Sequence, residues 1–453
     1  MSAGGCPGSV RAAIAGSVLA SFGLQAVVLV SGVLAARLLG VTDRGNLALL
    51  WVVAIVLAQL GTLSVPAAVT YFVAEGSASA GAMLRSVKRV AVLQLAALIV
   101  VHALILWGIV HDEAADVQVA ALITLLPVPA LFAHQYGQAV LQGRHRFRLY
   151  NRQRALPLVL YSLGLGGAFV LGSGNLVGIA AIWAGATALG AGSTLLVAWV
   201  DLRRHGVSGP GPAPPTRTSL RFGLRSLLGT FTGFEQLLLD QAIVALALST
   251  EALGLYVVAI AFSNLPRLVG QSIGIVAFPA VARAASERRA RRAVLRFFVI
   301  GAIASGLLVG ALELAVPTLL PLFFGTEFHE AVLVAQILLV GALCQSVRRV
   351  LSDAARGAGY PLLGTVAEVS SLAVLLPAML LLAPTHGLSG MAVALDIAAG
   401  AGLAVVGIGL LVAAARRGPK RPAHGTEDYS LPLVGAGIIE PQPSADAGGG
   451  RTP

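Results

Sequence analysis

The sequence predicts an all-α, polytopic membrane protein with about 12 transmembrane helices, arranged as two six-helix lobes related by a parallel pseudo-repeat. Apolar residues make up 57% of the 453 residues and charged residues only 11%, whereas soluble domains are about 45–50% apolar and about 25% charged. The apolar residues form long runs without the alternation that barrel strands show. The basic residues gather in alternate gaps between these runs, as they do in proteins that cross a membrane repeatedly.

This composition excludes several classes of protein. A mean hydropathy of +0.86 does not fit a cytosolic enzyme, a secreted disulfide scaffold or a disordered chain. Cys6 lies in the N-terminal tail and Cys344 in an apolar run, so we expect no disulfide. No cleavable signal peptide precedes the first apolar run, which is therefore expected to stay in the membrane as a signal anchor.

Each expected span is a run long enough to cross the hydrocarbon core, which takes about 20 apolar residues. Six such runs precede a Gly- and Pro-rich stretch, Gly209–Pro215, and six follow it. The sequence thus predicts a first lobe at 1–200, a linker at 201–222, a second lobe at 223–415 and a disordered tail at 416–453. The expected spans are, in order, 14–36, 47–74, 89–110, 117–140, 155–173, 176–200, 223–248, 254–280, 294–320, 331–351, 361–383 and 388–415.

The charges orient these spans. Starting from the N-terminal tail, alternate gaps collect 28 of the 31 Lys and Arg residues. The other side collects only Arg37 and Arg44, and Arg267 lies inside the eighth span. Because Lys and Arg accumulate in cytoplasmic loops, we expect both termini to be cytoplasmic. The net charge of +11 is then a consequence of topology. The basic inner face favours anionic membrane lipids as partners, and we expect no nucleic-acid partner.

The two halves show a weak internal repeat. Because six spans is an even number, both halves would share one orientation, with a pseudo-axis along the membrane normal. The alternative explanation is that glycine is common at helix ends. The matching stretches are Ala36–Gly40 and Arg44–Ala48 with Ala245–Ser249 and Leu253–Val257, at an offset of 209, and Leu141–Arg144 with Ala355–Ala358, at an offset of 214.

Ionisable residues within the spans are the first candidates for a site, since a charge at a helix centre costs about 2.5–3.5 kcal/mol. Arg267 lies at mid-depth in span eight, directly after Pro266, and Glu235 lies at similar depth in span seven. Asp240 is five residues further toward the outside. One interpretation makes Arg267 the anchor for an anionic substrate, with a nearby carboxylate releasing it or binding a coupling cation. The other is a static ion pair between Glu235 and Arg267.

Other polar residues extend the candidate site. Gln25 and Gln59 lie mid-span in helices one and two, where they would line a polar cavity or hydrogen-bond between helices. Arg37 and Arg44 are the only bases on the outer side, which suggests an outer gate that holds a phosphate group or pairs with Asp43. The alternative for these two arginines is a solvated helix end.

Motifs for catalysis are missing from the sequence. We find no nucleophile elbow, P-loop, dinucleotide fingerprint or His/Cys cluster with metal-ligand spacing. The sequence therefore predicts neither an enzyme nor a bound cofactor or metal. The spans by themselves carry more acids than bases, which argues against a strongly cationic lumen.

Several short stretches resemble the bacterial polysaccharide and lipid-linked oligosaccharide flippases of the multidrug/oligosaccharidyl-lipid/polysaccharide exporter superfamily. They cover most of residues 12–415 in the expected order, and each is degenerate. The stretches are Ala35–Gly45, Leu239–Gln241, Leu253–Ala259, Phe278–Arg283, Gly325–Phe328, Ala355–Pro361 and Gly387–Gly390. One departure is Val41-Thr42, where relatives often have Pro and an acid.

This resemblance implies a two-lobed transporter with a central cavity in the bacterial inner membrane. It would flip an undecaprenyl-pyrophosphate-linked oligosaccharide to the outer leaflet by alternating access, with H⁺ or Na⁺ coupling and glycan-assembly enzymes as further partners. Arg267 would bind the pyrophosphate or acidic sugars.

Four alternatives to this flippase remain. The first is a cation-coupled drug or metabolite antiporter of the same superfamily. The second is a peptidoglycan-precursor flippase, which usually has extra helices and more cavity arginines that this chain lacks. A membrane polymerase would need a large outer loop, and the outer gaps here are short. A purely structural membrane protein would leave the buried charges unexplained.

Overall fold

The computed structural model describes residues 7–204, 214–230, 238–284 and 286–415, and all regular structure within these ranges is helical. The helices are α1 (Pro7–Gly61), α2 (Val65–Ala74), α3 (Ala80–Val110), α4 (Ala115–Ile123), α5 (Pro127–Gly143), α6 (Phe147–Val170), α7 (Leu176–Arg204), α8 (Thr216–Thr230), α9 (Leu239–Ala247), α10 (Thr250–Ala282), α11 (Glu287–Phe324), the 3₁₀ helix η2 (Thr326–Phe328), α12 (Ala331–Gly357) and α13 (Leu362–Ala415).

These helices correspond to the twelve expected spans, and the seventh span also includes residues 231–237, which lie outside the described residues. Two of the helices are double, because α1 turns at Gly40 (φ 71°) and α13 turns at Gly387 (φ 55°). Glycine suits both turns because it adopts positive φ without a steric penalty. The second half of α1 continues as α2, α4 continues as α5, and α8 continues toward α9. The remaining helices cross singly, so the predicted fold class and span count are confirmed.

Two spans that the sequence predicts as continuous are broken next to a proline. The segment expected at 47–74 stops at the end of α1 and restarts as α2, with Leu63 at φ 48° and Pro66 in the first turn of α2. The segment expected at 117–140 divides into α4 and α5, and Pro127 opens α5. Proline lacks the N–H that a helix interior needs, and its ring opposes the carbonyl of the preceding turn. Both breaks follow from this property.

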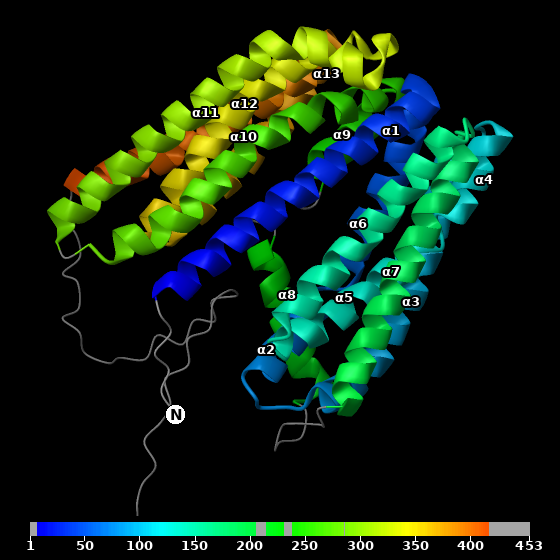
Figure 1. Ribbon diagram of the computed structural model, residues 1–453, viewed down its shortest axis with the longest axis horizontal. Helices are drawn as coiled ribbons and strands as arrows, with labels where there is room; N and C mark the ends of the chain where they lie inside the picture. Colours follow the sequence, from blue (N-terminus) through cyan, green and yellow to red (C-terminus); the bar gives the residue numbers. More distant parts are fainter. Residues whose placement is uncertain (1–6, 205–213, 231–237, 285, 416–453) are drawn as a thin grey trace, which may run out of the picture.

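The seventh span passes from one lobe to the other. Its first part, α8, packs on α2 and α3, where Gly223 lies against the carbonyl of Leu63 and Phe222 stacks on Tyr71 at 4.7 Å between ring centroids. Its second part, α9, packs instead on α10, α1 and α13. Residues 231–237, between the two parts, lie outside the described residues. Figure 1 shows α8 beside α2 and α9 beside α10.

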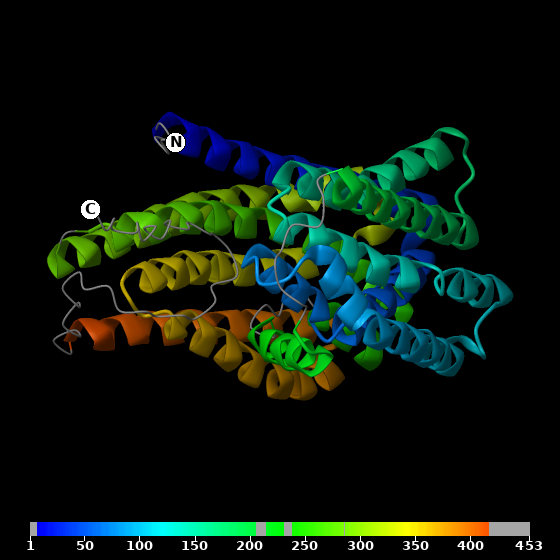
Figure 2. The ribbon, with the colours of Figure 1, turned by 90° about the horizontal axis from the view of Figure 1, so that it is seen from below.

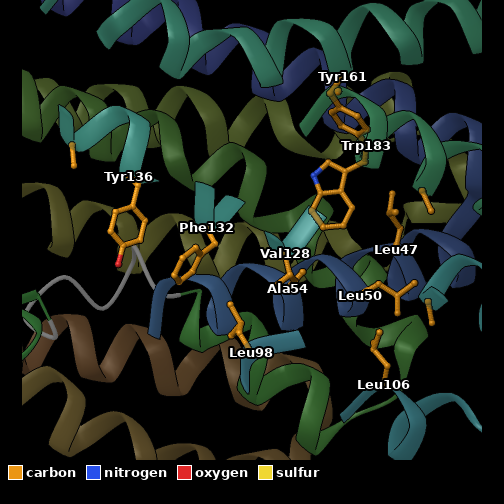
Figure 3. Close-up of a cluster of buried hydrophobic side chains, with 14 of the residues drawn as sticks. Leu47, Leu50, Ala54, Leu98, Leu106, Val128, Phe132, Tyr136, Tyr161 and Trp183 are labelled. Carbon is orange, nitrogen blue, oxygen red and sulfur yellow. The ribbon is translucent and has the colours of Figure 1, made fainter. Parts of the chain in front are cut away.

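The helices gather into two lobes that meet at one end and diverge toward the other (Figure 1), and Figure 2 shows the same helices from below. The first lobe encloses an apolar core formed by α1 to α7, in which Trp183 and Tyr161 lie beside Leu47 and Leu50 (Figure 3). The second lobe encloses a separate core of α9 to α13 with η2. Large apolar side chains such as Trp107, which is 72% exposed, cover the outside, as a surface that faces lipid requires.

Helix α1 contributes to both cores, so it joins the lobes. Ala35 is buried in the first core and the next residue, Ala36, in the second. Leu47 and Ala48 divide in the same way. Lipid tails are as apolar as leucine, so helices in a membrane associate through close packing of small side chains. The alanines on opposite faces of α1 provide this packing toward both lobes.

The tightest contact between the lobes follows the internal repeat. A methyl group on Gly45 of α1 would overlap the carbonyl oxygen of Thr250, and one on Gly254 of α10 would overlap the carbonyl oxygen of Val41. Gly45 and Gly254 are 209 residues apart, and so are Val41 and Thr250. Each half thus presents the same two positions to the other, as a pseudo-two-fold axis between α1 and α10 requires.

The second pair of repeated stretches also occupies matching places. Gly143 lies against Val73 of α2, and Gly357 lies against Val281 of α10. A methyl group on either glycine would lie 3.0 and 3.1 Å, respectively, from the nearest valine carbon. These contacts join α5 to α2 and α12 to α10, which are corresponding helices of the two halves. Part of the predicted linker (205–213) and the tail (416–453) lie outside the described residues, so the predicted domain bounds stay predictions.

Candidate functional site

A polar cavity lies in the second lobe. We call the end of the molecule where α7 ends at Arg204 and α12 ends at Gly357 the arginine-rich end, and the end that holds Gly40 and Gly387 the opposite end. The cavity has a volume of about 540 Å³, lies between α9, α10, α12 and α13, and reaches Arg356 near the arginine-rich end. From the first lobe, only Gln25 of α1 lines it among the described residues.

Three of the residues that the sequence singles out come together here. Arg267, Asp240 and Gln25 all line the cavity. Nη1 of Arg267 donates a hydrogen bond to Oδ1 of Asn264, 3.2 Å away and one turn earlier on α10. The Asp240 carboxylate is 7% exposed and accepts a hydrogen bond from the Tyr256 hydroxyl at 2.8 Å. A base and an acid thus line the same cavity, and each is held by a neighbour on α10.

Two other candidates are placed differently. Glu235 lies outside the described residues, so its predicted contact with Arg267 stays a prediction. Gln59 is exposed near the end of α1 and is not among the described residues that line the cavity. Its backbone carbonyl accepts a hydrogen bond from the Thr62 hydroxyl at 3.0 Å, which caps the end of that helix before α2.

Helix α12 supplies the largest part of the polar lining, although the sequence did not lead us to predict it. Six polar side chains follow one face of α12 at intervals of three and four residues, which is the spacing of one helical face. This periodicity is visible in the sequence. The arginines at the end of α12, however, were assigned to a cytoplasmic loop, because basic residues accumulate in such loops. The six residues are Gln345, Arg348, Arg349, Ser352, Asp353 and Arg356.

Helix α12 reaches this position because α10 has two glycines on the facing side. Gly270 lies against Ser346, and Gly274 lies against Asp353, whose carboxylate would overlap a methyl group there. Their four-residue spacing is the small-residue pattern that lets membrane helices approach closely. This pattern is a second signal in the sequence. It brings the six polar residues of α12, which we call the α12 stripe, beside Arg267, which also lies on α10.

The basic residues of α12 are held by two acids. Arg348 forms an ion pair with Glu368 of α13. Nε of Arg349 lies 3.1 Å from Oδ2 of Asp353, and Nη1 of Arg356 lies 3.6 Å from Oδ1 of the same carboxylate. Asp353 is 5% exposed, so its charge has been removed from water and needs these partners.

Arginines and carboxylates nearly balance in the cavity, whereas the expected spans carry more acids than bases. Four arginines line it, against the three carboxylates of Asp240, Asp353 and Glu368 among the described residues. The expected spans carry more acids because Arg348 and Arg349, near the end of the expected span 331–351, and Arg356, beyond it, were counted with the inner loops. Helix α12 continues to Gly357, six residues beyond the expected end of that span, and carries these bases along the cavity wall.

The predicted outer-gate residues lie at the opposite end. The Arg37 guanidinium donates hydrogen bonds to the carbonyls of Leu322 and Phe323 in the last turn of α11, with Nε 2.7 Å from the Phe323 oxygen. A cation at a helix C-terminus satisfies carbonyls that have no partner within the helix. Arg37 thus fastens α1 of the first lobe to α11 of the second.

Asp43 and Arg44 do not form the alternative ion pair considered from the sequence. Asp43 accepts a hydrogen bond from the side chain of Asn46 at 3.4 Å, and no Asp43–Arg44 pair occurs among the ion pairs of the described residues. Arg44 is 7% exposed and lies near Tyr161 inside the first lobe. Its Nε has no hydrogen-bond partner in the described structure.

Comparison with protein families and known structures gives concordant results. A family model described as "Polysaccharide biosynthesis protein" matches residues 168–333. A structure of the lipid II flippase MurJ in an inward closed conformation superposes with a TM-score of 0.65 at 11% identity, covering 87% of each chain. An inward-facing multidrug resistance MATE family transporter of the MOP superfamily gives a TM-score of 0.65 at 15% identity, covering 86% of this chain and 95% of that one.

A further superposition involves a MOP superfamily transporter from Pyrococcus furiosus, with a TM-score of 0.54, 16% identity and coverage of 88% and 94%. No curated protein matches the sequence. The family model supports the expected resemblance to polysaccharide biosynthesis proteins, and the superpositions show that the chain shares the fold of MurJ and the MATE transporters.

Two MATE structures superpose on this chain to different extents. An outward-facing MATE transporter of the MOP superfamily gives a TM-score of 0.54, against 0.65 for the inward-facing one. In this structure, α1 packs on α10 and α11, and the cavity reaches the arginine-rich end.

Proposed function

We propose that the protein flips an undecaprenyl-pyrophosphate-linked oligosaccharide from the inner to the outer leaflet of the bacterial cell membrane by alternating access. The observation that carries this proposal is a polar cavity with Arg267 within it, extending to the arginine-rich end while α1 and α10 are in contact at the opposite end. The match to a polysaccharide biosynthesis family and the superposition on a lipid II flippase support the same class of cargo.

The cavity suits both parts of such a head group. A guanidinium binds phosphate through two parallel hydrogen bonds, which makes Arg267 the proposed partner of the pyrophosphate. The amides of Gln25, Gln271 and Gln345 and the hydroxyl of Ser352 line the same space, and they can donate to and accept from sugar hydroxyls. The lipid chains of the cargo would stay in the bilayer while the head group crosses.

The direction of transport follows from the charges. Lys and Arg accumulate on the cytoplasmic side of membrane proteins, so we place the arginine-rich end in the cytoplasm together with both termini. The cavity would then receive its cargo at the inner leaflet. Proton or sodium coupling would use the carboxylate of Asp240, with Glu235 as a further candidate, because a carboxylate near Arg267 competes with an anionic cargo.

The second candidate is a cation-coupled drug or metabolite antiporter. The superposition on MATE transporters favours it, as does the buried Asp240 in the cavity. An antiporter of that kind would not need a lipid-linked cargo, which makes the two candidates separable by experiment.

The deciding experiment measures lipid-linked glycan in the host after deletion of the gene. We expect undecaprenyl-linked oligosaccharide to accumulate in the inner leaflet and surface glycan to fall. Complementation with Arg267→Ala, at parental expression, should fail. Arg283→Ala is the matched control, because Arg283 caps the same α10 at its arginine-rich end and does not line the cavity among the described residues. It should restore export.

One result would contradict the proposed function, and another would contradict only the role of Arg267. Unchanged glycan after deletion would favour the antiporter, which a screen for drug or metabolite efflux would then test. Full export by the Arg267→Ala protein would remove Arg267 from the proposed site while leaving the flippase itself in place.

A further inference from the structure

We propose that Arg349 and Arg356 form an anion-binding vestibule with Asp353 at the arginine-rich end of the cavity, separate from Arg267. Its ligand would be a phosphate-containing head group, held there before it reaches Arg267. The order of these two steps rests on the proposed direction of transport. The vestibule itself rests on the geometry of α12, and it can be tested without transport.

The geometry places one buried acid between two half-exposed bases. Asp353 is 5% exposed and lies against Gly274 of α10. The Arg349 and Arg356 side chains are 54% and 48% exposed. Asp353 is therefore fixed in the wall, whereas both arginines line the cavity with half-exposed side chains.

The numbers of charges and donors favour an anion at this position. Two guanidinium groups share one carboxylate, which leaves one positive charge. Each guanidinium has five N–H donors, and one carboxylate accepts about four hydrogen bonds, so about six donors remain for water or a ligand. The neighbouring pair, Arg348 with Glu368, carries no net charge. The excess positive charge of α12 is thus concentrated at Arg349 and Arg356.

The Arg356 end of the vestibule lies well beyond Arg267 along α10. The Arg356 guanidinium carbon lies 6.0 Å from the centre of the Phe278 ring. Phe278 is eleven residues beyond Arg267 on α10, which corresponds to about 16 Å along a helix with a rise of 1.5 Å per residue. An anionic group would then occupy the two positions in succession.

Two further residues that line the cavity carry polar atoms without partners. The Ser352 hydroxyl and Oε1 of Gln345 are buried and have no hydrogen-bond partner in the described structure, and both residues line the cavity. A buried polar atom without a partner costs about 1–3 kcal/mol. Hydroxyl groups of a carbohydrate, or water, would satisfy them.

The test uses the purified full-length protein in nanodiscs of zwitterionic lipid, with inorganic pyrophosphate as the probe and calorimetry as the readout. We expect Arg349→Gln with Arg356→Gln to weaken binding by about tenfold or more, since charge-assisted hydrogen bonds to phosphate are lost. Asp353→Asn should strengthen binding, because it removes the competing carboxylate. Arg288→Gln with Arg289→Gln, at the start of α11 and outside the lining of the cavity, should leave binding unchanged.

Asp353 is buried, so its variant is accepted only if its thermal unfolding midpoint stays near that of the parent. Arg349→Gln alone, at a half-exposed position, then serves as the second variant and should weaken binding by itself. Parental affinity in the double arginine variant would overturn the proposal. So would complete loss of pyrophosphate binding in Arg267→Gln, because binding would then be confined to Arg267.

Nanodiscs that contain phosphatidylglycerol identify the source of the head group. Competition between this lipid and pyrophosphate in the parent, absent in the double variant, would support the vestibule and assign it to bilayer lipids. Undiminished pyrophosphate binding would support the vestibule and assign it to the carrier pyrophosphate. Failure of the proposed function would show instead in the glycan assay, whatever these binding results are.

Discussion

Gly402 has no side chain, and this leaves room for the ion pair between Arg348 and Glu368 in the cavity wall. A methyl group there would overlap the Ser371 hydroxyl and would lie 2.9 Å from Cδ of Arg348. The Arg348 side chain passes this point to reach Glu368 on the first half of α13. Its neutral pair with Glu368 leaves Arg349 and Arg356 as the bases with excess charge.

The substitution Gly402→Ala tests this role. We expect it to destabilise the protein by about 1–3 kcal/mol, because it overfills a packed site, and to lower the thermal unfolding midpoint in detergent. Gly407→Ala is the control on the same helix, since a methyl group there meets no atom within 4 Å. It should be neutral or slightly stabilising, because alanine favours helix. Equal midpoints for both variants would contradict the packing argument.

At the scale of the helices, the breaks within the spans provide packing sites for other helices. The break between α1 and α2 exposes the Leu63 carbonyl, and a methyl group on Gly223 of α8 would lie only 2.6 Å from that oxygen. Phe222 stacks on Tyr71 next to this contact. A break in span two thus forms the docking place for the first part of span seven, and it ties the chain that follows α7 to the first lobe.

Substitution of Gly223 by alanine should release α8 from this place. We expect a lower unfolding midpoint than the parent, since the methyl group meets backbone atoms that cannot move away. Gly185→Ala in α7 is the control, because open space surrounds that position. A cysteine pair at Phe222 and Tyr71 should form a disulfide in the parent background and do so more slowly with Gly223→Ala. Unchanged cross-linking would show that α8 docks by other contacts.

The sequence predicts the helices better than their interruptions. Long apolar runs identify the spans because the bilayer fixes their length. The breaks at Leu63 and before Pro127 were missed, because hydropathy averages over a proline and does not register a change of backbone direction. The α12 stripe was missed for another reason: Arg348 and Arg349 were counted by charge, although their spacing places them on a helical face.

The candidate site is predictable only in part. Arg267, Asp240 and Gln25 were found as polar residues within the expected spans, and they line one cavity. Gln59 satisfied the same criterion and lies elsewhere, because depth along a helix does not fix which face a residue occupies. The contact of Gly274 with Asp353 joins residues 79 positions apart in sequence, and only the packing of α10 on α12 shows it.

At the scale of the whole molecule, the charges predict which end faces the cytoplasm. In a cysteine-free background, Ser286→Cys, exposed at the arginine-rich end, should react with an impermeant thiol reagent only in inverted vesicles. Glu113→Cys, exposed after α3 at the opposite end, should react in intact cells. The reverse labelling would overturn the orientation and, with it, the direction proposed for transport.

The lobes meet through Gly45 and Gly254, so both glycines should control the closure of the opposite end. We expect Gly45→Ala and Gly254→Ala to separate α1 from α10 and to favour an arrangement that is open there. The reporter is a cysteine in place of Ala48, which is 3% exposed, and it should label faster in both variants. Gly306→Ala in α11, where a methyl group meets no atom within 4 Å, should not change the rate.

The reciprocal contact of these two glycines has a consequence for the origin of the chain. Residue 41 of one half meets residue 254 of the other, and residue 250 meets residue 45, which is the isologous contact that two identical subunits make about a two-fold axis. A half-length ancestor with six spans would close the same end by pairing with its own copy. Because six is even, its C-terminus would lie on the same side of the membrane as its partner's N-terminus. A short connecting peptide would then suffice to fuse the pair into one gene product.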